Sequence, residues 1–178
     1  LMLDPFESEN SLTMVGMLNN SGEKIVTFDH SEQQPTTEGG SIVQNILDDT
    51  HLLVMQNAIH DLTWLWESGF TYTGDIFDTM LGAYIIQRGQ KEPLSLEYLA
   101  ERYNCDTQKM GTLKDYFNRG YTTREIPHEE LSQYLSADLH ATMELYDKIN
   151  DQLNTHDTGL ADTVKLTNQI CIHLARIY

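Results

Sequence analysis

Two short groups of polar residues have the types and spacing that could do chemistry. The first follows the apolar run at 51–55 and contains Asn57, His60 and Asp61. The pattern predicts a buried strand that gives way to a helix, and ligands usually bind at the carboxyl ends of strands in α/β sheets. Asp61, in the first helical turn, could therefore hold a cation. Asn and Asp at a helix start are also common caps, so a purely structural role stays open.

The second group is Tyr134 and Asp138, which lie one turn apart on one face of a helix predicted to begin at Pro127. That face also carries the apolar seam of the helix, so Asp138 should point inward. A buried carboxylate is costly unless it is paired or binds a metal, and no Lys or Arg stands three or four residues away. The alternative is that Asp138 accepts hydrogen bonds from a loop.

Strands and loops that would position these groups can be read from apolar alternation and turn residues. Segments 12–17 and 24–28 predict two strands joined by a hairpin turn. The polar segment 31–40 predicts a loop, after which Ser41 should cap a short helix. Helix 57–69 is then expected to follow the strand at 51–55.

The rest of the chain predicts one further strand and helix and then helices alone. The strand and helix occupy 75–89, where Asp78 precedes the helical residues, and Ser95 should cap the next helix. The helix from Pro127 and another from about Leu160 end the chain. This order predicts an α/β layer with a helical tail.

Composition narrows the class of protein. The chain has 178 residues, 40% of them hydrophobic, with 27 acidic against 11 Lys and Arg side chains and a net charge of -16. No apolar run approaches the roughly 18 residues of a membrane span, and Cys105 and Cys171 are too isolated for a disulfide framework or structural zinc site. A reducing compartment fits best. The densest basic stretch is Lys109, Lys114, Arg119 and Arg124, so a nucleic-acid role requires masking cations or a positive neighbouring domain.

Four short motifs follow one another along the chain in an order that resembles a known family. They are Asn57-x-x-x-Asp61, the segment 77–84 (Phe-Asp-Thr-Met-Leu-x-Ala-Tyr), the segment 95–103 with its Ser-Leu-x-x-Leu-Ala pattern, and Tyr134-x-x-x-Asp138. In this order they resemble the proofreading 3′-5′ exonuclease domain of family A DNA polymerases, closest to the phage type. The similarity covers about residues 12–153.

The resemblance implies an α/β, RNase H-like exonuclease fold, with a mixed sheet flanked by helices and a C-terminal helical extension. Residues 1–153 would form the exonuclease domain, with its N-terminal strand incomplete. Residues 154–178 would be a linker and the start of a helix leading toward a polymerase domain, which is absent. The implied partners are the single-stranded 3′ end of DNA and that polymerase domain, with no membrane. The implied location is the cytoplasm of a bacterium or a phage-infected host.

The same resemblance assigns roles. Asp61 and Asp138 would be ligands of two divalent metal ions, Mg²⁺ or Mn²⁺, and Tyr134 would orient the attacking water. Asn57 would line the substrate cleft, and Asp78 would fix a helix start rather than bind metal. His60 would pack or form a hydrogen bond.

The chain departs from the family at the first motif, Asp-x-Glu, which supplies the other two ligands. Here Asp4 and Glu7 are spaced one residue too far apart, and Pro5 fits a central strand poorly. We expect the motif to be absent, with Asp4 and Glu7 as its alternative, and the chain to be a fragment with little or no nuclease activity of its own. Two other hypotheses stay open: an exoribonuclease resembling ribonuclease D, and an inactive exonuclease fold that serves as a structural or binding module.

Overall fold

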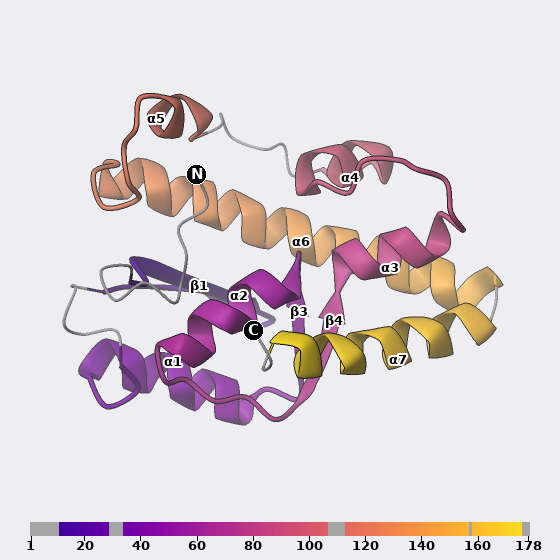
Figure 1. The fold of residues 1–178 in the computed structure, drawn as a ribbon, viewed down its shortest axis with the longest axis horizontal. Helices are drawn as coiled ribbons and strands as arrows, with labels where there is room; N and C mark the ends of the chain where they lie inside the picture. Colours follow the sequence, from indigo (N-terminus) through magenta and orange to yellow (C-terminus); the bar gives the residue numbers. More distant parts are fainter. Residues whose placement is uncertain (1–10, 29–33, 107–112, 157, 176–178) are drawn as a thin grey trace. The chain divides into compact units, whose positions relative to one another are not determined.

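The computed structural model describes residues 11–28, 34–106, 113–156 and 158–175 (Figure 1). Its residues cluster into two compact units. Of the described residues, the first contains 11–28, 34–49, 64–72 and 113–140, and the second contains 50–63, 73–106, 141–156 and 158–175. Helix α6 (His128–His156) contributes residues to both units, and so does α2 (Ala58–Glu67).

The predicted hairpin is confirmed in the first unit. Strands β1 (Met14–Asn19) and β2 (Gly22–Thr27) pair antiparallel, with Met14 opposite Thr27. The turn is closed by Asn19, whose side chain accepts a hydrogen bond from the Ser21 N–H at 2.8 Å. Gly22 has a φ of +131°, a backbone angle that residues with a side chain rarely adopt, which explains the glycine at this position.

Helix α1 (Glu38–Asp49) begins earlier than the sequence predicts. The expected cap, Ser41, lies inside the helix, where its hydroxyl donates to the Glu38 carbonyl oxygen. Thr37 takes the capping role instead, because its hydroxyl oxygen accepts from the Gly40 N–H at 3.1 Å. The prediction was wrong because Gly39 and Gly40 were taken for loop residues. A side chain at Gly40 would collide with the backbone of Gln34, so this glycine permits a tight entry into the helix.

The core of the first unit lies between the hairpin, α1 and the end of α2. Phe28 and Phe70 are 3% and 1% exposed, and their ring centroids are 6.3 Å apart. Val43 of α1 is fully buried. The hairpin also packs on α6, since a Cβ at Gly16 would lie 2.8 Å from side-chain atoms of both Leu135 and Leu139.

The second unit contains the other strands. β3 (Leu52–Met55) and β4 (Asp75–Asp78) form a parallel pair, with Met55 opposite Asp78. Thus the described residues form two separate two-stranded sheets, one antiparallel and one parallel, rather than one mixed sheet. The strand at 51–55 was predicted to be buried, yet Leu52 is 40% exposed. Its only strand neighbour in the described part of the chain is β4.

Helices complete the second unit. α3 (Thr79–Ile86) follows β4 directly, and α4 (Leu96–Arg102) begins at Ser95, whose hydroxyl accepts from the Tyr98 N–H as predicted. α7 (Thr158–Ala175) packs against α3 and β4. The core of this unit joins these helices to the second half of α6 through the buried side chains Ala83, Leu99, Leu145, Ile149, Leu153 and Val164. The short helix α5 (Lys114–Asn118) belongs to the first unit.

A helix that spans a membrane must be both long and apolar, and this applies to the helices of the described residues. None of them meets both conditions.

Candidate functional site

The junction between β3 and α2 has an unusual backbone. Asn57 has a φ of +66°, in the left-handed region, and the next residue begins the helix. Asn visits this region more readily than most residues because its short polar side chain can hydrogen-bond locally. The conformation turns the chain sharply from strand to helix, which places Asp61 in the first turn of α2 as predicted.

Asp78 holds this junction together. One of its carboxylate oxygens, Oδ1, accepts from the Asn57 N–H at 3.0 Å and the Met80 N–H at 2.9 Å. The other, Oδ2, accepts from the Ala58 N–H at 2.9 Å. A single carboxylate therefore caps α3 and also satisfies the first N–H groups of α2, 20 residues earlier in the chain. This confirms that Asp78 fixes a helix start.

The environment of Asp78 shifts its acidity in two opposing ways. The residue is only 1% exposed, and this burial raises the pKa of its carboxyl group. Its hydrogen bonds from backbone N–H groups, including that of Leu81, lower the pKa and offset part of the rise. With both oxygens already engaged, Asp78 has a positioning role.

Three more polar side chains support the junction. The Thr79 hydroxyl donates to Gln56 Oε1 at 2.5 Å and to the Met55 carbonyl oxygen at 3.1 Å. Gln56 Nε2 donates to the Leu94 carbonyl oxygen, which ties the junction to the segment before α4. Asn168 of α7 accepts from the Asp78 N–H at 3.1 Å. Reasoning from the sequence missed these contacts, because the partners lie 23 to 90 residues apart.

Asp61 is the acid that this junction presents. Protein packed around its carboxylate raises the pKa to about 7, and the negative charge of Asp78 adds to the rise. Water nevertheless reaches the side chain. Asp61 is therefore crowded by protein but accessible, as a carboxylate that binds a cation must be. The neighbouring His60 is half-buried, and burial lowers its pKa, which agrees with a packing role.

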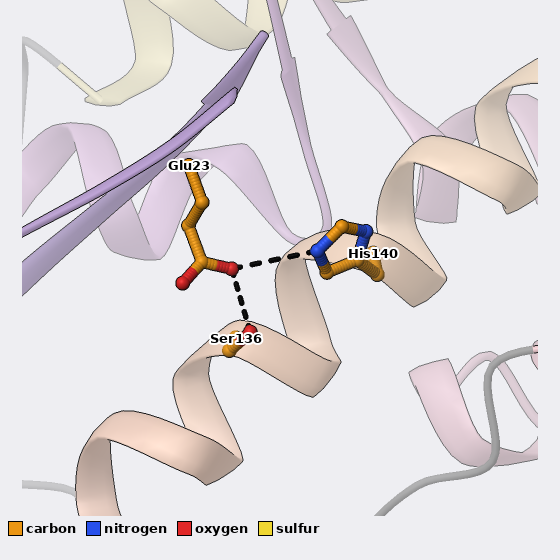
Figure 2. A network of polar contacts seen from close by, with 3 residues as sticks. All are labelled: Glu23, Ser136 and His140. Carbon is orange, nitrogen blue, oxygen red and sulfur yellow. Dashed lines mark hydrogen bonds and ion pairs between the residues drawn. The ribbon is translucent and has the colours of Figure 1, made fainter.

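Tyr134 and Asp138 are both half-buried on α6, in the first unit. Figure 2 shows that Ser136 and His140 of this helix face Glu23 of β2. The Ser136 hydroxyl donates to Glu23 Oε2 at 2.6 Å, and His140 Nε2 lies 3.5 Å from the same oxygen. Since two positions along a helix are a rotation of about 200°, Tyr134 and Asp138 lie on the face turned away from this contact. One Asp138 oxygen, Oδ1, is completely covered.

The structure thus places Asn57 and Asp61 in the second unit, and Tyr134 and Asp138 in the first. Asp4 and Glu7 lie outside the described residues. Among the residues that are described, no group of three or more His, Cys, Asp and Glu side chains is arranged to hold a metal ion. The described acids alone therefore do not make up the predicted two-metal site, and the convergence of Asp61 with Asp138 stays a prediction.

A cavity of about 260 Å³ lies within the second unit, beside β4 and α7. Its lining includes Asp75, Lys165 and the buried Asn168 but none of the predicted site residues. The Nδ2 of Asn168 is fully covered and makes no hydrogen bond to a described residue. Asn168 lines this cavity and also accepts a hydrogen bond from the Asp78 N–H. The cavity therefore lies next to the β3–α2 junction but does not contain it.

Comparisons with known proteins agree with the ordered motifs. A model of the 3′-5′ exonuclease family matches residues 3–154. DNA polymerase I of Synechocystis sp. is 30% identical over 103 residues, which cover 58% of this chain and 10% of that protein. Protein RRP6-like 2 of Arabidopsis thaliana is 28% identical over 128 residues (68% and 14%), and exosome complex component 10 of Homo sapiens is 29% identical over 124 residues (69% and 13%).

This chain spans only 10% to 14% of the length of those relatives. No solved structure gives a significant match. The family match nevertheless covers most of the chain, from before β1 nearly to the end of α6, and includes all four ordered motifs. The α/β architecture of the described residues is consistent with the RNase H-like fold that the motifs predicted. The chain belongs to the 3′-5′ exonuclease family.

Proposed function

We propose that this chain is a metal-dependent 3′-5′ exonuclease domain that hydrolyses the 3′-terminal phosphodiester of single-stranded DNA, as the proofreading part of a DNA polymerase. The observation that carries the proposal is the family match over residues 3–154, which includes both Asp61 and Asp138. The fixed β3–α2 junction supports it, because it presents Asp61 as an accessible carboxylate.

In this proposal each residue has one task. Asp61 and Asp138 supply carboxylate oxygens to two divalent ions, Mg²⁺ or Mn²⁺, and hard cations prefer such ligands. When bound, paired ions of this kind favour attack by water and departure of the leaving oxygen. Tyr134 orients the attacking water through its hydroxyl, and Asn57 contacts the terminal nucleotide. The remaining ligands would come from Asp4 and Glu7 or from a motif that precedes them in a longer chain.

A second candidate is an exoribonuclease that uses the same acids on RNA. Two of the three relatives named above are not DNA polymerases, which favours keeping RNA as a test substrate. The order and spacing of the motifs favour DNA.

The test is a cleavage assay on single-stranded DNA and on RNA of the same sequence, each labelled at the 5′ end. The purified chain should shorten DNA slowly from its 3′ end, faster than RNA, and only with Mg²⁺ or Mn²⁺. Asp61→Ala and Asp138→Ala should remove this activity. Asp151→Ala, an exposed acid farther along α6, is the matched control.

Shortening that persists in a chelator, or in both acid variants, would refute the proposal. A preference for RNA would select the exoribonuclease. If the folded wild-type domain shows no metal-dependent cleavage, either alone or within a longer parent protein, the hypothesis of an inactive binding module is the correct one.

A further inference from the structure

Helix α7 lies beyond the part of the chain that the exonuclease family match covers. The match ends at residue 154, whereas α7 begins at Thr158. The helix nevertheless packs against α3 and β4 inside the second unit (Figure 1), and its Val164 belongs to the core of that unit. The contacts of α7 therefore reach β4, the strand that ends at Asp78.

A buried polar side chain, Asn168, reaches from α7 to this strand. Asn168 is 2% exposed, and burial of an amide costs free energy unless hydrogen bonds replace those it made with water. Its Oδ1 accepts from the Asp78 N–H at 3.1 Å, where β4 passes into α3. Its Nδ2 makes no hydrogen bond to a described residue. The contact with Asp78 is thus the one hydrogen bond that this side chain makes within the described part of the chain.

An asparagine at this position does not serve packing alone. A buried donor that lacks an acceptor, such as the Asn168 Nδ2, destabilises the folded state. Leucine has a similar size and shape and would avoid that cost. What asparagine adds is its carbonyl oxygen, which holds the backbone of Asp78.

Asp78 connects this contact to the β3–α2 junction. Its backbone N–H donates to Asn168, while its carboxylate accepts from the Asn57 and Ala58 N–H groups at 3.0 and 2.9 Å. Ala58 begins α2, and Asp61 lies in the first turn of that helix. Two successive hydrogen bonds therefore link a side chain of α7 to the backbone that carries Asp61, all within the second unit.

We propose that Asn168 is a positioning residue for Asp61: it fixes the backbone of Asp78, whose carboxylate in turn fixes the start of α2. The inference rests on the proposed function, which gives Asp61 the task of binding a divalent ion. It makes α7 a working part of the nuclease, whereas the sequence predicted a linker and a helix that leads toward another domain. Such a role matters because a misplacement of about 1 Å in a catalytic site can lower a rate about 100-fold.

Hydrogen exchange tests the positioning without metal or substrate. Backbone amide exchange is measured by NMR on the metal-free 178-residue chain, as wild type and as Asn168→Leu, which keeps the volume and removes the acceptor. The Asp78, Asn57 and Ala58 N–H groups should exchange about tenfold faster in the variant, the equivalent of one lost hydrogen bond. Amides in the middle of α6, around the buried Leu145, should keep their rates.

Val164→Ala is the matched control, because Val164 is buried one turn earlier on the same helix and its side chain cannot form a hydrogen bond. This variant should speed exchange in α6 and α7 without singling out the junction. Unchanged rates at Asn57 and Ala58 in Asn168→Leu, or a general rise like that of Val164→Ala, would overturn the positioning role. If Asn168→Leu does not fold, Asn168→Ala takes its place. Failure of both to fold would make Asn168 a residue of the core and overturn the proposal too.

Mn²⁺ gives a second readout. A bound Mn²⁺ ion broadens the NMR signals of nearby amides, so the wild type should lose the Asp61 signal as the ion is added. Asn168→Leu should need about tenfold more Mn²⁺ for the same loss, the free energy of the missing hydrogen bond. Val164→Ala should respond like the wild type.

The same preparations separate this inference from the proposed function. If the wild type binds Mn²⁺ at Asp61 and cleaves DNA, and Asn168→Leu matches it in exchange, Mn²⁺ response and cleavage, the positioning role is wrong and the exonuclease assignment stands. If exchange rises selectively at the junction but the wild type neither responds to Mn²⁺ at Asp61 nor cleaves, Asn168 holds the junction and the exonuclease assignment fails.

Discussion

Asp61 and Asp78 are the same residue type in contrasting surroundings. Asp78 is sealed in the protein and accepts backbone N–H groups from two helix starts, so its carboxylate holds structure. Asp61 is crowded by protein yet reached by water, and it lies near the charge of Asp78. An ionised Asp61 is therefore unfavourable in the folded chain until a cation neutralises it.

This predicts that Asp61→Asn stabilises the metal-free protein in a pH-dependent manner. Because the folded-state pKa of Asp61, about 7, lies above its unfolded value of 3.8, the wild type loses stability as the pH rises from 4 to 7. The variant should gain about 1 kcal/mol at pH 8, a figure reduced by solvent screening, and almost nothing at pH 4. Urea unfolding at both pH values measures the difference.

Asp151→Asn is the control, since it removes one negative charge from an exposed position of the same acidic chain. Equal gains in both variants would mean that general charge repulsion, rather than the surroundings of Asp61, sets the effect. Added Mg²⁺ should reverse the order by stabilising the wild type only.

Removing the carboxylate of Asp78 should be severe. Asp78→Ala leaves the N–H groups at the starts of α2 and α3 without their acceptor, so we expect a loss of about 3 kcal/mol in unfolding free energy. Ser95→Ala removes a cap with a single partner and should cost about 1 kcal/mol. A loss for Asp78→Ala no larger than that for Ser95→Ala would show that Asp78 does not join the two helix starts.

Of the contacts that Asp78 makes, the sequence predicted only the cap of α3. Asp78 before a helical pattern is a local capping signal, and the structure confirms it. Its bonds to Asn57 and Ala58 depend on the parallel register of β3 and β4, which brings Met55 opposite Asp78. Register of this kind arises from packing across the sheet, so no local pattern contains it.

Among the elements, the hairpin and α6 meet through an apolar contact and a polar one. Gly16 lets β1 approach Leu135 and Leu139, while Glu23 of β2 engages Ser136 and His140. The hairpin thereby fixes the rotation of α6 and with it the direction of Tyr134 and Asp138. The sequence predicted both elements, but not that a glycine would mark their contact.

A methyl group at Gly16 should therefore destabilise the first unit. Gly16→Ala places a Cβ within 2.8 Å of side-chain atoms of Leu135 and Leu139, and overpacking of this kind costs about 1–3 kcal/mol. Thermal or urea unfolding measures it. In a Leu139→Ala background, where one colliding side chain is gone, the additional cost should fall. Equal costs in both backgrounds would mean that strand conformation, rather than collision, is responsible.

Element boundaries were predicted least well where glycines carry a packing role. Gly39 and Gly40 suggested a loop, yet both lie in α1, and the side chain of Thr37 rather than Ser41 caps that helix. Glycine is common in loops because of its freedom, but here it serves close approach to Val26 and to the Gln34 backbone. Composition alone cannot distinguish these two uses.

At the scale of the molecule, the ordered motifs predicted the family correctly, because four spacings along the chain are more specific than any one of them. The metal centre could not be predicted to the same depth. The predicted ligands lie in distant segments of the chain, and two of them, Asp4 and Glu7, fall outside the described residues.

The proposed division of labour can be tested in a parent polymerase that contains this domain. Asp138→Ala should reduce 3′-5′ cleavage by at least 100-fold and leave DNA synthesis unchanged, because only the hydrolytic site loses a ligand. Primer degradation and extension, measured on one preparation, give both rates. Retained proofreading would show that Asp138 is not a ligand, and a parallel fall in synthesis would point to misfolding.

The left-handed backbone at Asn57 also governs how its amide should be studied. Alanine scanning would mislead at this position, because alanine keeps the β-carbon that strains this geometry but lacks the polar group with which Asn offsets the strain. The substitution would therefore disturb the turn and remove the amide at the same time. Glycine preserves the bend while deleting only the functional group. A saturation library should accordingly favour Asn, Gly and Asp for expression, whereas selection for catalysis would separate Asn from Gly.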